Sequence, residues 1–216
     1  MVSCGNFTWE LTFGPLPARL ARIKRMLAAG FVLAGGRSSR MGWDKALLPY
    51  HDTVLVDWIA RQVESAAGSV TLIGPPERYL FLGRPVLADL RPGLGPLAGI
   101  ETALSSTAAE FNLIVACDLP NLTAEMLAGL LEAARNQDAD CVLPDAPGVS
   151  HPPLCGVWRR RCRDPVREAL NHGIRKLARL LDELDVCRWG LTDSAWAVNL
   201  NTPEEYRHQL ARSRNA

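Results

Sequence analysis

A glycine-rich loop carries the first residues whose types and spacing could do chemistry. A short apolar run stops at Gly35 and Gly36, and the loop that follows contains Arg40 and reaches Lys45. Glycine lets a backbone approach a ligand closely, and successive amide groups in a turn form a nest for anions. The loop lacks both the Gly-x-Gly-x-x-Gly pattern and a Gly-Lys-Ser/Thr ending, which excludes the two commonest phosphate loops. Its composition favours phosphate binding over an ordinary connection with two solvated cations.

Two aspartates follow apolar runs of the kind that form buried strands. Asp118 follows residues 111–117 and precedes Pro120, and Asp89 follows residues 85–88. A carboxylate at the exposed end of a strand is well placed to hold Mg²⁺ against the phosphates of a nucleotide, because magnesium sites use only one or two carboxylates. The alternative is that each aspartate caps the turn after its strand. The residues alone leave both interpretations open.

The second half of the chain contributes a further group of polar candidates. His151, beside a proline, could be a base, a substrate ligand or a structural histidine. Arg175 and Lys176 begin a predicted helix after a glycine, where they could meet an anionic substrate or form an exposed face. Asn199 and Asn201 share one face of a predicted strand, because strand side chains alternate, or they form a strand edge that turns into a capped helix.

Apolar runs alternate with amphipathic segments along the chain, and this alternation predicts the elements that position these residues. The predicted strands are 31–34, 70–74, 85–89, 111–117, 139–144, 151–158 and 197–201. The predicted helices are 54–67 with Gly68 at its end, 97–106, 123–136 with Thr123 as its cap, 164–173 with Asp164 as its cap, 175–184, and one that starts with the capping box Thr202-Pro203-Glu204-Glu205. Four strands that are each followed by a helix-sized segment predict an α/β doubly wound fold, with a mostly parallel sheet and helices on both faces. Ligands of such folds bind at the carboxyl ends of the strands, where the glycine-rich loop and both aspartates lie.

Length and composition narrow the class of protein. The 216 residues suffice for one core, and a net charge of +1 gives no general attraction to nucleic acid or to a membrane. The six cysteines show no metal-ligand spacing, which indicates reduced thiols and a cytoplasmic protein. The basic and apolar stretch around residues 22–36 superficially resembles a signal peptide, but cleavage there would remove the opening strand. We expect residues 1–25 to be a loosely ordered extension, with Met26 as a hypothetical natural start.

Five motifs recur in one order and together resemble the molybdenum cofactor guanylyltransferase family, over about residues 27–212. They are Leu33-Ala34-Gly35-Gly36-x-Ser38-x-Arg40-Met41-Gly42-x-Asp44-Lys45, Pro96-Leu97-Ala98-Gly99, Cys117-Asp118-x-Pro120, His151-Pro152, and Asn199-x-Asn201-Thr202-Pro203-Glu204-Glu205. The resemblance implies a single Rossmann-like nucleotidyltransferase domain at 26–216. Its nucleotide-binding part would cover about 26–145, and its acceptor-binding part about 146–216.

The resemblance also implies roles for individual residues. The nucleotide contacts would be Leu33, Ala34, Gly35, Gly36, Lys45, Asp89 and Asp118. The catalytic set would be Arg40, Lys45, Asp118, Asn199 and Asn201, with Asp118 also holding Mg²⁺. One departure is that Ile73-Gly74 stands at the end of the second strand, where the family often has a polar nucleotide contact such as Asn. That contact is therefore expected to be absent or made by the backbone.

The implied reaction is transfer of GMP from GTP to molybdopterin that carries molybdenum, with release of pyrophosphate. The product would serve molybdoenzymes or their chaperones. A cytidylyltransferase acting on the same pterin is the nearest alternative, but that branch usually has Leu-Ala-Ala-Gly where this chain has Leu33-Ala34-Gly35-Gly36. A sugar-phosphate nucleotidyltransferase would not explain the Asn-x-Asn-Thr-Pro-Glu-Glu motif. A non-catalytic nucleotide-binding module would not need Arg40, Lys45 and Asp118 together.

Overall fold

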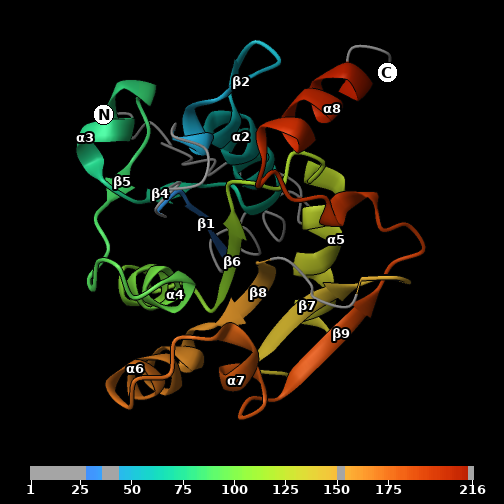
Figure 1. The fold of residues 1–216 in the computed structure, drawn as a ribbon. Coiled ribbons are helices and arrows are strands. Elements are labelled where there is room, and N and C mark those ends of the chain that lie inside the picture. Colours follow the sequence, from blue (N-terminus) through green and yellow to red (C-terminus); the bar gives the residue numbers. More distant parts are fainter. Residues whose placement is uncertain (1–27, 36–43, 150–153, 214–216) are drawn as a thin grey trace, which may run out of the picture.

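The computed structural model describes residues 28–35, 44–149 and 154–213, and a seven-stranded sheet is its central feature (Figure 1). The strands of this sheet are β1 (Ala28–Leu33), β4 (Thr71–Ile73), β5 (Val86–Leu87), β6 (Phe111–Ala116), β7 (Cys141–Asp145), β8 (Cys155–Arg159) and β9 (Val186–Gly190). A separate hairpin consists of β2 (Pro49–Tyr50) and β3 (Thr53–Val54). The α-helices are α2 (Leu55–Ala67), α3 (Pro76–Tyr79), α4 (Pro96–Ser105), α5 (Ala124–Arg135), α6 (Arg163–Asn171), α7 (Leu177–Leu181) and α8 (Pro203–Ser213). Short 3-10 helices are η1 (Lys45–Leu47), η2 (Leu80–Leu82), η3 (Arg160–Cys162) and η4 (Ala195–Ala197).

The order of the strands confirms the predicted α/β fold. The sheet runs β5-β4-β1-β6-β8-β7-β9, and the first four strands are parallel. β8 pairs antiparallel with both β6 and β7, while β9 returns parallel to β7. The sheet is therefore mostly parallel, and β1, β4, β5 and β6 end at one common edge. Ligands of doubly wound sheets bind at that edge.

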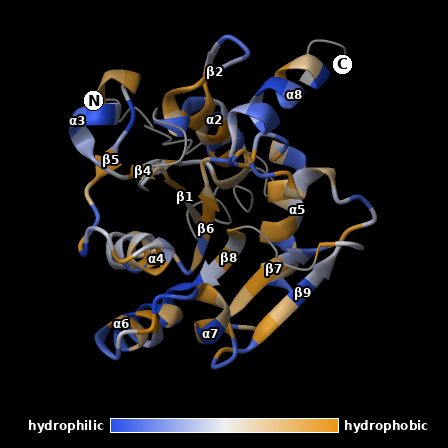
Figure 2. Cartoon of the chain, in the orientation of Figure 1, coloured by the Kyte–Doolittle hydropathy of each residue, from blue (hydrophilic) through white to orange (hydrophobic). Residues whose placement is uncertain are grey.

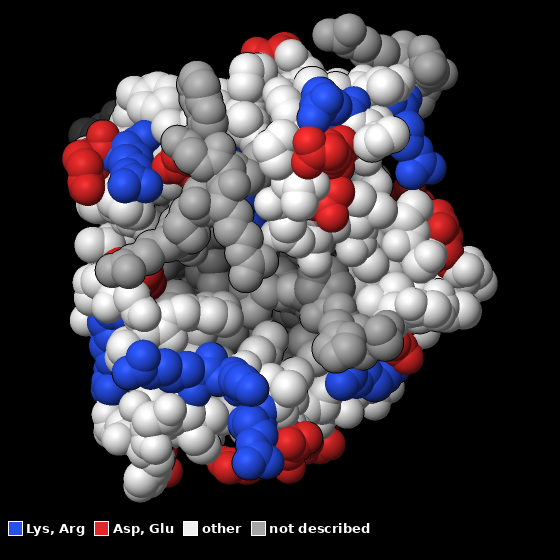
Figure 3. All heavy atoms as spheres, viewed as in Figure 1, with Lys and Arg blue, Asp and Glu red and all other residues white. Residues whose placement is uncertain are grey.

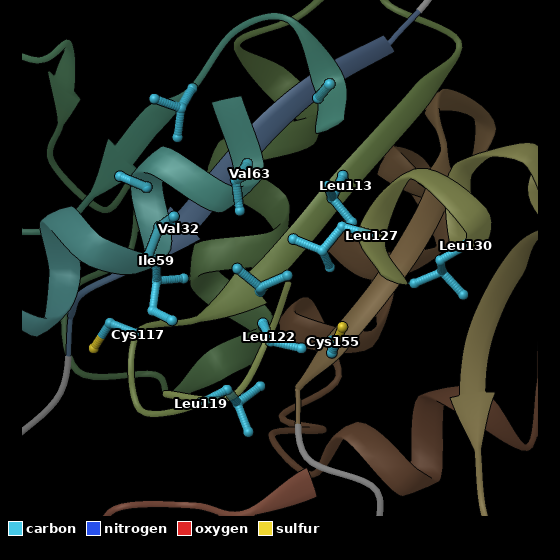
Figure 4. Close-up of a cluster of buried hydrophobic side chains, with 14 of the residues drawn as sticks. Val32, Ile59, Val63, Leu113, Cys117, Leu119, Leu122, Leu127, Leu130 and Cys155 are labelled. Carbon is cyan, nitrogen blue, oxygen red and sulfur yellow. The ribbon is translucent and has the colours of Figure 1, made fainter. Parts of the chain in front are cut away.

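Two hydrophobic clusters cover the two faces of the sheet. Val32 belongs to the cluster under α2 and α5, while its neighbours Phe31 and Leu33 belong to the cluster under α4 and α6. This alternation is the period of two that a strand imposes on its side chains. Figure 4 shows the first cluster, in which Ile59 of α2 and Leu127 of α5 lie over the sheet. Apolar residues accordingly mark the central strands in Figure 2, as expected for a parallel sheet that is buried on both faces.

Local signals at helix ends are confirmed where they were clearest. The Thr123 hydroxyl accepts a hydrogen bond from the Met126 amide at 3.2 Å, so it caps α5 as predicted. Gly68 ends α2 in the left-handed conformation. The capping box before α8 is also confirmed, because the Glu205 amide donates to the Thr202 hydroxyl at 3.2 Å. Such caps satisfy backbone groups that a helix leaves without internal partners.

Three predictions about the second half are wrong, and one strand was not predicted. Residues 197–201 are not a strand, since Ala197 ends η4 and the segment pairs with none of the described strands. Strand β9 was not predicted. Helix α7 covers 177–181 instead of 175–184. The cap of α6 was also wrong, because η3 runs directly into that helix and places Asp164 in its first turn. Residues 1–25 lie outside the described residues, and the division at about residue 145 stays a prediction.

Candidate functional site at the carboxyl edge of the sheet

Lys45 and Asp118 meet at the carboxyl edge of the sheet, although they are 73 residues apart in sequence. The Lys45 ammonium donates a hydrogen bond to Asp118 Oδ2. Asp118 follows β6 and Lys45 begins η1, and their side chains keep 16% and 24% of their surface exposed. The ion pair is thus partly shielded yet open to a ligand. The predicted convergence of these two residues is confirmed, whereas their roles in a reaction are not tested by it.

Short backbone and capping contacts hold this pair in place. The Cys117 amide donates to the Leu33 carbonyl at 3.1 Å, which ties the end of β6 to the end of β1. Asp44 caps η1, because its Oδ1 accepts from the Ala46 amide at 3.1 Å. The cap sets the direction in which Lys45 leaves the backbone. The orientation of the Lys45 side chain therefore depends on Asp44.

Asp89 and Gly35 lie against each other at the same edge. Asp89 follows β5, and a Cβ built on Gly35 would lie only 3.0 Å from Asp89 Oδ2. Glycine at position 35 therefore leaves room for the carboxylate. Asp89 Oδ1 is buried and has no hydrogen-bond partner among the residues that the structure describes. Burial raises the pKa of this carboxyl group, and a buried oxygen without a partner favours a ligand that can donate to it.

The end of β4 contributes its backbone to this edge. The Ala34 amide donates to the Ile73 carbonyl at 2.8 Å, and the Gly74 amide donates to the Leu87 carbonyl at 2.9 Å. These two groups are therefore engaged within the protein. The nucleotide contact here was expected to be absent or made by the backbone, and the Gly74 amide is not free to make it.

The segment with Asn199 and Asn201 passes beside Asp118. The Leu200 amide donates to the backbone carbonyl of Asp118 at 3.0 Å, and Leu200 itself is buried. Asn199 is half-buried and Asn201 is exposed. The Asn201 amide donates to Glu205 Oε2 at 2.6 Å, as part of the cap of α8. The structure thus brings both asparagines to the neighbourhood of Asp118, although as an extended crossing and not as a strand.

A buried glutamine of α8 braces the two segments that carry Lys45 and Asp118. Gln209 is 6% exposed, and its Nε2 donates to the Tyr50 hydroxyl at 3.0 Å and to Asn121 Oδ1 at 2.5 Å. Tyr50 lies five residues after Lys45, and Asn121 lies three residues after Asp118. Figure 1 shows α8 beside the β2 hairpin. Sequence reasoning missed this brace, because a single glutamine on a polar helix gives no signal of burial.

Other predicted residues lie elsewhere or outside the description. Arg175 and Lys176 are exposed in the connection between α6 and α7, and none of the described contacts joins them to Lys45 or Asp118. Figure 3 shows a band of Lys and Arg side chains between α4 and α6. Gly36, Arg40 and His151 lie outside the described residues, so their predicted roles stay predictions.

The cysteines of the described chain are free, and Cys117 and Cys155 are unsuited to nucleophilic chemistry. Burial raises the pKa of the Cys117 and Cys155 thiols to about 12. A thiol with so high a pKa is not a nucleophile at neutral pH. The interpretation of these two cysteines as small buried hydrophobic residues is confirmed.

The described residues contain no group of three or more His, Cys, Asp or Glu side chains that could hold a metal ion. Asp118 is therefore not part of an all-protein metal cage within these ranges. None of the helices in the described part of the chain is long and apolar enough to cross a membrane.

Comparisons with known proteins agree with this architecture. A family model described as a MobA-like NTP transferase domain matches residues 30–186. A probable molybdenum cofactor guanylyltransferase of Trichormus variabilis is 36% identical over 184 residues, which cover 81% of this chain and 86% of the relative. A protein of the same name from Mycobacterium bovis is 37% identical over 180 residues, which cover 81% of this chain and 89% of the relative.

A solved structure shows the same fold. The crystal structure of molybdopterin-guanine dinucleotide biosynthesis protein A from Archaeoglobus fulgidus superposes with a TM-score of 0.75. The match covers 87% of this chain and 100% of that chain, at 21% sequence identity. The likeness confirms the Rossmann-like nucleotidyltransferase fold, and at this identity it carries no further conclusion.

Proposed function

Because this chain belongs to the MobA-like NTP transferase family, we propose that it transfers GMP from GTP to molybdopterin that carries molybdenum, and releases pyrophosphate. Its curated relatives bear the name molybdenum cofactor guanylyltransferase, which supports a nucleotidyltransferase acting in molybdenum cofactor biosynthesis. The observation that carries the proposal is the Lys45–Asp118 ion pair at the carboxyl edge of the sheet. A cation and a carboxylate at this edge are the two groups that a nucleoside triphosphate requires.

Lys45 has a simple part in this reaction. Its ammonium is bonded to the Asp118 carboxylate. A triphosphate offers stronger and more numerous anionic oxygens, so we expect Lys45 to exchange its carboxylate partner for phosphate oxygens. Its charge then offsets the charge that grows on the departing pyrophosphate. Arg40 is proposed to act on the same phosphates.

Asp118 is a fitting ligand for Mg²⁺. It is a strand-end carboxylate that keeps part of its surface exposed. Magnesium typically binds one or two carboxylates and takes its other ligands from phosphates and water. When bound, the ion would neutralise phosphate charge and orient the triphosphate.

The residues of this chain contribute mainly by positioning the two substrates and less by transferring protons. The terminal phosphate of molybdopterin is already an anion, so no strong base is needed for its in-line attack on the α-phosphorus of GTP. Holding the two phosphates in line is then the main contribution, together with charge stabilisation. Asn199 and Asn201 are proposed to border the acceptor side, because their segment is bonded to the Asp118 backbone.

Asp89 supports guanine as the base. Its buried Oδ1 has no partner within the described chain, and its Oδ2 lies 3.0 Å from the position of a Cβ built on Gly35. Guanine has two neighbouring donors, N1–H and the N2 amino group, which a carboxylate can accept. Cytosine presents only its N4 amino donor, beside ring acceptors that a carboxylate repels. We propose that the guanine edge satisfies Asp89, and that the reaction takes place in the cytoplasm, with molybdoenzymes or their chaperones as recipients.

The test is pyrophosphate release from GTP in the presence of Mg²⁺ and molybdopterin. We expect Asp118→Ala to abolish transfer while the thermal unfolding midpoint shows a folded protein. Asp182→Ala is the matched control, because Asp182 is an exposed carboxylate at the end of α7, and it should keep full activity. Full Mg²⁺-dependent activity in Asp118→Ala would contradict the proposed function.

A further inference from the structure

The hydroxyl of Tyr79 lies between the two ends of the glycine-rich loop. It is 2.9 Å from the Ala34 carbonyl oxygen and 3.0 Å from Asp44 Oδ2. These two acceptors are ten residues apart in sequence and flank the loop on either side. Tyr79 itself is fully buried at the end of α3. One phenolic hydrogen is therefore shared between a carbonyl that follows β1 and a carboxylate that precedes Lys45.

The tyrosine ring occupies space that the end of β4 leaves open. A Cβ built on Gly74 would lie 2.9 Å from Tyr79 Cε2 and 3.3 Å from the Gly35 amide nitrogen. Any side chain at position 74 would therefore push against both the ring and the end of β1. Gly74 stands where the family often has a polar residue, and its lack of a side chain leaves room for the Tyr79 ring. The ring in turn sets the position of the hydroxyl.

Asp44 connects Tyr79 to the turn that begins with Lys45. One of its oxygens accepts from the Ala46 amide at 3.1 Å, while the other accepts from Tyr79 and, at 3.3 Å, from Arg78 Nη1. Asp44 therefore links α3 to the first turn of η1, where Lys45 begins. Burial and the negative charge of Asp44 raise the pKa of the Tyr79 phenol. The phenol thus keeps its proton at physiological pH and acts as a donor.

We propose that Tyr79 is a positioning residue, which holds Ala34 and Asp44 at a fixed separation and thereby sets the spacing between the nucleotide-contacting backbone and Lys45. A tyrosine with a purely structural role needs one acceptor for its hydroxyl, and any nearby carbonyl suffices. The hydroxyl of Tyr79 instead meets one acceptor on each side of the loop, and one of them is the cap of the helix that carries Lys45. The kinetic part of this inference rests on the proposed function, whereas the structural part does not.

The experiment compares Tyr79→Phe with Tyr206→Phe. Both changes remove one hydroxyl and keep the ring, but the single hydroxyl hydrogen of Tyr206 is donated to the Pro49 carbonyl in β2. Hydrogen–deuterium exchange without ligand is measured at the amides of Ala46 to Leu48. Steady-state kinetics then gives KM for GTP and kcat separately. Thermal unfolding checks that both variants fold.

We expect faster exchange at Ala46 to Leu48 in Tyr79→Phe and unchanged exchange there in Tyr206→Phe. KM for GTP should rise about tenfold in Tyr79→Phe with kcat changed by less than about twofold, since tenfold corresponds to about 1.4 kcal/mol, within the range of one hydrogen bond. Unchanged exchange together with unchanged KM would overturn the inference. If wild type transfers no GMP but Tyr79→Phe exchanges faster, the proposed function fails while the positioning role stands.

A second variant covers the case in which Tyr79→Phe does not fold. Asp44→Ala leaves the tyrosine in place and removes its acceptor on the Lys45 side, so KM for GTP should rise in this variant as well. Where both single variants fold, adding Tyr79→Phe to Asp44→Ala should raise KM no further than Asp44→Ala alone, because the Tyr79–Asp44 link is already broken in Asp44→Ala. A fully additive rise, or an unchanged KM in Asp44→Ala, would overturn the inference.

Discussion

Substituting Gly35 by alanine tests the proposed guanine contact, because a side chain at position 35 would crowd the Asp89 carboxylate. The added Cβ would lie 3.0 Å from Asp89 Oδ2, against ordinary contacts of 3.4 Å or more. The carboxylate would therefore have to move by about 0.4 Å, the difference between those distances. Gly35 does not have a positive φ, so an alanine at this position adds bulk without straining the backbone.

The size of the effect follows from the interaction that is displaced. A hydrogen bond to a charged group contributes roughly 1.5–3 kcal/mol, and part of that is lost when the geometry is disturbed. We expect Gly35→Ala to lose about 1.4 kcal/mol of this interaction, which corresponds to a tenfold fall in kcat/KM for GTP. The value for CTP should change by less than about twofold, because cytosine does not use the Asp89 contact. The preference for GTP over CTP should thus loosen by about tenfold.

The assay measures kcat/KM for GTP and for CTP in parallel, with Gly190→Ala as the control. A Cβ on Gly190 would meet nothing within 4 Å, so this variant should keep the wild-type ratio. An unchanged GTP-to-CTP ratio in Gly35→Ala would refute the argument that the space beside Gly35 selects the base. An equal fall for both nucleotides would refute it as well, since it would show general damage.

Two further predictions concern groups whose environment is clear. Burial raises the pKa of the Asp89 carboxyl above its ordinary value, so its ionisation weakens the folded state as the pH rises through the folded pKa. Asp89→Asn should therefore unfold at a higher temperature than wild type at pH 7.5 without nucleotide, and this difference in unfolding temperature should close toward pH 4. KM for GTP should rise in the same variant. A difference in unfolding temperature that does not depend on pH would contradict this. Thr123→Ala removes the cap of α5 and should lower the free energy of unfolding by about 1 kcal/mol. Tm should fall by about 2–4 °C, while kcat/KM stays unchanged. A Tm equal to that of wild type would show that the cap does not stabilise the helix.

Local chemistry explains which parts of the fold were predictable. Thr123, Gly68 and the Thr202–Glu205 box act on their own neighbours, so their residue types alone signal a helix end. The buried parallel strands are continuous apolar runs, and their common direction brought Asp89 and Asp118 to one edge. Strand β9 has Arg188 within it and lies partly exposed at the end of the sheet, so it lacks such a run.

The contacts that were missed depend on residues far apart in sequence. Tyr79 meets Ala34 and Asp44, and Gln209 meets Tyr50 and Asn121, across separations that no local pattern reports. The segment at 197–201 alternates like a strand, yet its position across the end of β6 leaves it no strand to pair with. The sequence thus predicted which residues gather at the edge, but not what holds them there.

The central claim is tested most directly by the product formed from a mixture of equal GTP and CTP, with Mg²⁺ and molybdopterin that carries molybdenum. Mass spectrometry of the products distinguishes the guanine from the cytosine dinucleotide. We predict pyrophosphate release and the guanine dinucleotide as the main product. Predominance of the cytosine dinucleotide, or absence of any dinucleotide from folded protein, would contradict the proposed function.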